Sequence, residues 1–382
     1  MSAAIGHELP EPQTSLFGYA LRLHEQAPDK PLPRDGEPYP DDGLHRRQPR
    51  PKPPEDRRTE GVDIARILDE HFAQPSALPS ALAGAFHDIY VPIHRNDDVA
   101  NAAHRADVDR VRNTGLWLVR HATDRCSATV GLALLAAVGT TDDIPLIQTI
   151  GLLSHRFGPL ATHALERLPG HLESLLWLAD RVAGWGRVYA VEALCRLDDT
   201  GARPWLPRKT VDGDFLNGYF AGKVATVARL HEALSEFERD SELLDHTGRL
   251  LHVMTYCGGM GTTLRHYPHA AVVLEAHARH VGRLEATIER FFIVAVLAQH
   301  LTTEPPENVG STEAQRDAVL AAYLSLLDRE DWCELARAGL AAQDSRLQWL
   351  AGSGAAQLHL RAFGPRCTRR GIVHVRNKTD RQ

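Results

Sequence analysis

The segment AVEALCRL, residues 190–197, repeats a pattern that occurs twice before it, in GLALLAAV (131–138) and ATHALERL (161–168). The copies are offset by 30 and 29 residues. Glycine or alanine stands first in each copy, and leucine or valine stands fifth and eighth. Small residues let a neighbouring helix approach closely, and large ones fill the layer between units. The pattern predicts a repeated helical unit with a continuous core.

A turn and a second apolar segment follow each copy, which is typical of a helix, a turn and a helix per unit. Hydrophobic residues make up 43% of the chain but aromatic residues only 6%, because the apolar positions are mostly leucine, alanine and valine. Alanine and leucine favour helix. We therefore expect an all-α protein, an α-solenoid of antiparallel helix pairs over residues 61–360, with the clearest repeats at 127–210.

The two ends differ from this repeat region. Residues 25–60 are rich in proline and poor in apolar side chains, which predicts a disordered or polyproline II linker. Ahead of it, SLFGYALRLHE (15–25) predicts a short amphipathic helix that either docks on the body, which we favour, or serves as a tethered recognition peptide. Residues 1–60 thus form an N-terminal segment. Residues 361–382 form a basic tail with seven Lys or Arg against one Asp.

The segment GWGRVYAVEAL (184–194), followed by a Trp-Leu turn at 205–206, resembles a group of largely uncharacterised actinobacterial HEAT-like proteins. Members of that group carry a G-W-G-R-[IV]-x-x-V-E-x-L segment. The resemblance extends over about residues 110–300 and is strongest at 157–210, with a repeat shorter than the usual HEAT unit. It implies a helical solenoid whose function is binding.

The predicted function is a non-catalytic HEAT-like scaffold that binds a protein partner through its solenoid surface, without a cofactor. Some members of the group carry the label limonene hydroxylase, and HEAT-like DNA glycosylases share the architecture. An enzyme of either kind is the alternative. For the glycosylase, Trp177, Asp180, Trp185 and Arg187 supply the residue types that handle a damaged base. The sequence contains no dinucleotide fingerprint and no metal triad that spacing establishes.

The expected binding surface consists of charged and aromatic residues of the repeats and of the turn before Gly184. These candidates are Glu166, Arg167, Asp180, Trp185, Arg187, Glu192 and Arg196. We expect Glu166, Arg167, Arg187, Glu192 and Arg196 to be exposed. Within the turn, Gly184 is expected to stop one helix and Gly186 to let the next begin at close range. Asp180, Arg181 and Arg187 are expected to pair around it.

Two histidine-rich stretches have residue types that bind metals. The first contains His266, His269, Glu275, His277 and His280. The second contains His87, Asp88, His94, Asp97, Asp98, His104 and Asp107. Neither has an H-E-x-x-H spacing, and the five cysteines form no C-x-x-C pair, so no metal site is predicted. Solvated or helix-end histidines are the expected interpretation.

The formal net charge of the chain is -6, with basic residues concentrated near residue 50 and in the tail. An acidic body does not favour general capture of the nucleic-acid backbone, so nucleic acid is not an expected partner. The longest apolar runs are about half of the roughly 20 residues that span a bilayer. With scattered cysteines and no secretory signal, these features predict a cytoplasmic protein that does not enter a membrane.

Overall fold

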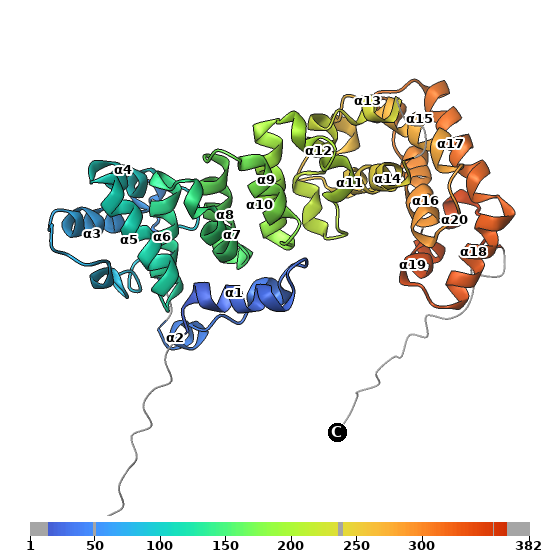
Figure 1. Cartoon of the computed structure of the whole chain (residues 1–382). Coiled ribbons are helices and arrows are strands. Elements are labelled where there is room, and N and C mark those ends of the chain that lie inside the picture. The colour runs from blue at the N-terminus through green and yellow to red at the C-terminus, as the bar shows by residue number, and fades with distance from the viewer. Residues whose placement is uncertain (1–13, 49–50, 236–239, 354, 365–382) are drawn as a thin grey trace, which may run out of the picture. The chain divides into compact units, whose positions relative to one another are not determined.

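The computed structural model describes residues 14–48, 51–235, 240–353 and 355–364. Within these ranges all regular structure is helical and no strand occurs, so the all-α prediction is confirmed (Figure 1). The chain divides into two compact units, the first ending at Arg203 and the second beginning at Pro204. This boundary falls inside the repeat range 127–210, a division that the periodicity did not predict. Residues 365–382 of the predicted tail lie outside the described ranges.

The first unit contains ten α-helices in its described part. They are α1 (Leu16–Gln26), α2 (Asp42–Arg47), α3 (Val62–Phe72), α4 (Asp97–Arg105), α5 (Val108–His121), α6 (Arg125–Val138), α7 (Ile144–Gly151), α8 (Ser154–Glu166), α9 (His171–Ala179) and α10 (Gly184–Leu197). A core of buried side chains, including Leu68, Phe86 and Leu118, joins α3, α5, α6 and the loop before α4.

The three sequence copies fall on α6, α8 and α10, and these helices pack in succession, α8 against both α6 and α10. The intervening α7 packs on α8, and α9 packs on α10. The first positions of the copies, Gly131, Ala161 and Ala190, are all buried, as are the leucines at the fifth positions. The sequence register therefore places equivalent residues in equivalent packing layers.

Two glycines position the start of α10. A Cβ atom on Gly186 would lie 2.3 Å from the Cβ of Ser154, so the first turn of α10 touches the first turn of α8, as predicted. The role predicted for Gly184 is corrected. The helix α9 already ends at Ala179, and Gly184 is the first residue of α10, with φ +53°. Its left-handed backbone redirects the chain into the new helix.

We predict that Gly131→Ala destabilises the first unit, although alanine favours helix. The added Cβ would lie 2.6 Å from the Cβ of Leu118 and 3.0 Å from the carbonyl oxygen of Gly115, so α5 and α6 must separate. Overpacking of this kind costs about 1–3 kcal/mol in the free energy of unfolding, measured by urea denaturation. Gly43→Ala is the control, because nothing lies within 4 Å of its Cβ position. Equal stabilities of the two variants would contradict the close-approach argument.

The predicted N-terminal helix forms as α1 and docks on α5 and α7 (Figure 1), which confirms the docking prediction. Leu16 and Ala20 are fully buried, and the backbone N–H of Leu16 donates to the carbonyl oxygen of Ala122. The hydroxyl of Tyr19 donates to the carbonyl oxygen of Gly36 at 2.9 Å, which ties the helix to the proline-rich chain after it.

The predicted disordered linker is corrected for residues 27–48, which are ordered on the surface of the first unit. Leu32 and Tyr39 are buried there, and Asp41 accepts hydrogen bonds from the backbone and guanidinium of Arg125, with a closest distance of 2.6 Å. The average apolar content is low, but these few side chains insert individually between helices. The backbone of this segment includes a short 3₁₀ turn at Pro33–Gly36 and the helix α2.

We predict that Asp41→Asn costs about 1.5–3 kcal/mol of stability, because the buried Arg125 guanidinium loses one of its two carboxylate partners and keeps only Asp42. Burial alone would raise the pKa of Asp41, but hydrogen bonds and charge from Arg125 outweigh it and hold the pKa below 3.8. The stability that the ionised Asp41 carboxylate contributes is therefore complete above pH 3.8, and it is lost as the pH falls through the lowered pKa. Urea denaturation of the wild type and of Asp41→Asn, at pH 7 and in acid, measures the difference in their free energies of unfolding.

Asp63→Asn, at an exposed position on α3, is the matched control for that experiment. A stability difference between wild type and Asp41→Asn that persists undiminished in strong acid would contradict the assigned role of the carboxylate.

The second unit contains ten further α-helices in its described part. They are α11 (Leu206–Lys209), α12 (Ala221–Val227), α13 (Leu230–Ser235), α14 (Ser241–Tyr256), α15 (Ala270–Val281), α16 (Ile288–Thr303), α17 (Glu313–Leu327), α18 (Glu330–Ala341), α19 (Ser345–Ser353) and α20 (Ala355–Leu358). The helix α16 packs against α14, α17, α18 and α19. Phe291 and Trp332 are fully buried at this centre.

Candidate functional site

The predicted binding residues Glu166 and Arg196 meet across the first unit. The guanidinium of Arg196 on α10 makes two hydrogen bonds to the carboxylate of Glu166 on α8, at 2.9 and 3.0 Å. The Arg196 side chain is more than half exposed, so the pair lies at the surface. The pair therefore joins the C-terminal ends of α8 and α10.

Arg187 was expected to be exposed, and this expectation is wrong: only 8% of the residue is accessible. The reason is the close contact between Gly186 and Ser154, which brings the first turn of α10 against α8 and covers the next residue. The other candidates lie nearer the surface. Arg167 and Arg196 are exposed as expected, whereas Glu166 and Glu192, which were also expected to be exposed, are partly buried. Asp180 is exposed at the end of α9, and Trp185 is half-buried on α10.

A groove about 120 Å³ in volume lies between α4, α6 and α8. We call it the arginine groove and define it by Arg95, His104, His163 and Arg167, whose side chains line it together with small apolar residues of α6. The Arg167 guanidinium donates to the carbonyl oxygen of Ala136, which holds the side chain along the wall. Of the predicted binding residues, Arg167 is the one that lines this groove.

Three guanidinium groups lie near His163 in the arginine groove. Burial lowers the pKa of His163 below its ordinary value, and the negative charge of Glu166 opposes this shift. The positive charges of Arg95, Arg167 and Arg196 lower the pKa further. His163 is therefore held neutral close to three guanidinium groups, two of which are paired with carboxylates. An incoming carboxylate or other anion would find both charge and donors there.

Aromatic rings continue the same surface toward the start of α10. The rings of Trp185 and Tyr189 stack at a centroid distance of 6.0 Å, and His94 meets Tyr189 edge-on at 5.7 Å. We call these three residues the aromatic shelf. His94 directly precedes Arg95 in the chain, and the ring of Tyr189 lies 3.3 Å from the Cβ position of Gly158 on α8, the helix that carries His163, so the shelf and the arginine groove share this helix. Sequence reasoning identified Trp185 but missed Tyr189 and Arg95, whose positions depend on how the loop before α4 folds.

Other residues around the predicted turn contact the N-terminal segment. Arg181, expected to pair within the turn, instead forms an ion pair with Asp29 at 2.9 Å and lies 4.5 Å from the ring of Trp177. The ring of His24 meets Trp177 edge-on, and the hydroxyl of Ser154 donates to Asp35. Trp177 therefore packs with the N-terminal segment, whereas Trp185 packs with the aromatic shelf.

Among the described residues, neither predicted histidine group is gathered into a set with metal-binding spacing. His277 is buried and lies 2.9 Å from the hydroxyl of Tyr323, while His269 stacks on His231. His94 and His104 contribute to the aromatic shelf and the arginine groove instead. His87 is the exception, because it lies beside two residues from other segments.

These two residues are His45 on α2 and Cys126 on α6. One ligand atom each from His45, His87 and Cys126 lies within 4.8 Å of the other two. His87 and Cys126 are buried, His45 is half-buried, and the two imidazole rings are 4.9 Å apart. The positions 45, 87 and 126 follow no metal-binding spacing, so only the docked N-terminal segment reveals the cluster.

The second unit contains a cavity of about 350 Å³ between α14, α16 and the start of α19. Its chemically notable lining residues are Arg249, His252, Tyr256, Glu289, Phe292 and Arg346. Arg249 and Glu289 form a bidentate pair at 2.7 and 2.8 Å, which holds the pKa of Glu289 below its ordinary value. Burial lowers the pKa of His252 to about 4, so this imidazole is neutral at pH 7.

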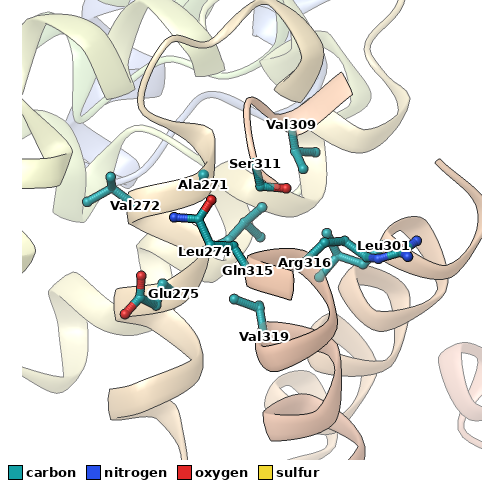
Figure 2. A pocket seen from close by; sticks show the side chains of 10 residues that line it. All are labelled: Ala271, Val272, Leu274, Glu275, Leu301, Val309, Ser311, Gln315, Arg316 and Val319. Carbon is teal, nitrogen blue, oxygen red and sulfur yellow. The ribbon is translucent and has the colours of Figure 1, made fainter. Parts of the chain in front are cut away.

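A second pocket in this unit is smaller and mainly apolar. Figure 2 shows it between α15, α17 and the segment around Val309, with Leu274 and Val319 on its walls. Its volume is about 40 Å³, which suits the end of one apolar side chain and not a cofactor. The charged side chains of Glu275 and Arg316 lie at its edge (Figure 2).

Comparisons of the chain with models of protein families, with curated proteins and with solved structures found no match. In the described ranges, no helix combines the length and the apolar character that crossing a bilayer requires. The function is therefore inferred from the sites themselves.

We predict that His252 makes the second unit sensitive to acid. Its pKa is about 4 in the folded chain and near 6.5 when unfolded, so the unfolded state binds more protons between these values. Stability should fall as the pH drops from 6.5 to 4, and His252→Gln should reduce the size of this fall. Chemical denaturation across that range measures it. His266→Gln, at an exposed position, is the control and should leave the pH dependence unchanged.

Proposed function

We propose that the chain is a HEAT-like helical repeat scaffold that binds a partner protein through its first unit. The serial packing of α6, α8 and α10, with matched residues buried in each, supports a solenoid of stacked helix pairs. Such proteins bind partners through side chains of several consecutive units, and that is where the arginine groove and the aromatic shelf lie.

The observation that carries the proposal is the adjacency of the arginine groove and the aromatic shelf. Arginine offers a planar set of donors that fits a carboxylate, and aromatic rings provide apolar contact area beside it. The groove is too small for a cofactor but wide enough for one side chain. The partner that fits is an extended protein segment with an acidic side chain near an apolar or aromatic one.

The test compares three immobilised forms of the full chain as baits in extract from the native cell. They are the wild type, the groove variant Arg95→Glu/Arg167→Glu and the control Arg58→Glu/Arg66→Glu, whose sites are exposed on the same unit. Both variants change the net charge equally. We expect a partner that wild type and control retain and the groove variant loses by about tenfold or more, since reversed charge costs several kcal/mol.

Quantitative mass spectrometry after nuclease treatment measures the captured proteins, and high salt should weaken the same partner. If all three baits retain every captured protein equally, the arginine groove is not the binding surface. If capture disappears only after nuclease treatment, the partner is a nucleic acid and the proposal is wrong.

A further inference from the structure

We propose that His45, His87 and Cys126 bind a zinc ion that fastens the N-terminal segment to the core of the first unit. The three ligand atoms come from α2, from the loop before α4 and from the first turn of α6. Imidazole nitrogen and thiolate sulfur are the ligands that zinc prefers in proteins. This inference is independent of the proposed partner binding.

The distances suit a single ion. In a tetrahedral zinc site, ligand atoms lie about 3.5 Å apart, given bonds of roughly 2.0–2.3 Å. The three atoms here lie within 4.8 Å of one another, so movements of roughly 1 Å bring them to bonding geometry. Three protein ligands leave the fourth position to water.

The hydrogen bonding of each histidine ring also favours binding of a ligand. Both ring nitrogens of His87 are buried without a hydrogen-bond partner, an arrangement that costs free energy unless something binds there. The Nε2 atom of His45 lies 3.0 Å from the carboxylate of Asp41. A carboxylate on one ring nitrogen orients the other toward a metal, so Nδ1 of His45 is the assigned ligand.

The scaffold around the cluster holds the three segments together. Arg125 donates to Asp41 through its backbone and its guanidinium, and Arg125 directly precedes Cys126. The backbone N–H of Gly84 donates to the hydroxyl of Ser127 at 3.1 Å, which positions the loop that carries His87. The supporting contacts therefore come from the residues on either side of the cysteine.

The local charge also favours a divalent cation. Asp41 and Asp42 both bond to Arg125, so two carboxylates share one guanidinium. Zinc binding deprotonates the Cys126 thiol and releases the proton to solvent, which adds one further negative charge. The cluster then carries two net negative charges beside its neutral imidazoles, and a zinc ion balances them.

The experiment uses the full reduced chain, stripped with a chelator and dialysed against zinc. Elemental analysis should find one zinc per chain in the wild type, none in Cys126→Ser and one in Cys195→Ser, which alters another buried cysteine of the same unit. Cobalt in place of zinc should give a thiolate-to-metal charge-transfer band that Cys126→Ser abolishes. Circular dichroism confirms that each variant is folded.

His45→Gln is the second variant, because His45 lies on the short helix α2, outside the helices that form the core, and glutamine can keep a hydrogen bond to Asp41. It should weaken zinc binding by more than about tenfold. In the wild type, zinc at about 100 times its Kd should raise the melting temperature by roughly 5–10 °C and slow proteolysis of residues 27–48. The proposal is overturned if the wild type does not bind stoichiometric zinc. It is also overturned if the cobalt band survives in Cys126→Ser, or if His45→Gln binds the metal as tightly as the wild type.

Discussion

Close approach of helix backbones at small residues is the constraint on which the first unit depends. At Gly131 and Gly186 there is no room for a Cβ atom between neighbouring helices. Such contacts set the spacing of α5 against α6 and of α8 against α10, and larger residues fill the remaining space at normal packing density. The position of every surface side chain on these helices follows from that spacing, including the burial of Arg187.

The N-terminal segment is a structural part of the first unit. Its buried ion pair, Asp41 with Arg125, lies where the proline-rich chain reaches the first turn of α6. A buried pair of this kind contributes specificity, because either partner alone would be a desolvated charge. The segment uses Arg181 and Trp177 as contacts as well, so residues that looked available for function belong to its docking surface.

Both proposed sites of the first unit lie where separate segments of the chain meet. The arginine groove forms where the loop before α4 brings Arg95 over α8, and the zinc cluster forms where α2 brings His45 to Cys126. Each site combines side chains from segments that share no local pattern. A scaffold of regular helices with irregular segments docked on it can therefore carry two sites of different chemistry without changing its core.

The sequence by itself determined the helical class and the register of the three copies. These follow from local spacing, because buried residues must recur with the period of the helix. The choice of Glu166, Arg167 and Arg196 as binding residues stays a prediction from the sequence. Periodicity is a property of one element and its nearest neighbours, so a single sequence is enough to read it.

Only the tertiary structure decided what the irregular segments do. Their anchors, such as Tyr39 and Asp41, are single residues without a repeating pattern, and each gains its partner from a helix far along the chain. The same reason explains why His45, His87 and Cys126 could not be predicted as a set. Long-range contacts between single residues leave no period in the sequence, and only the folded chain brings them together.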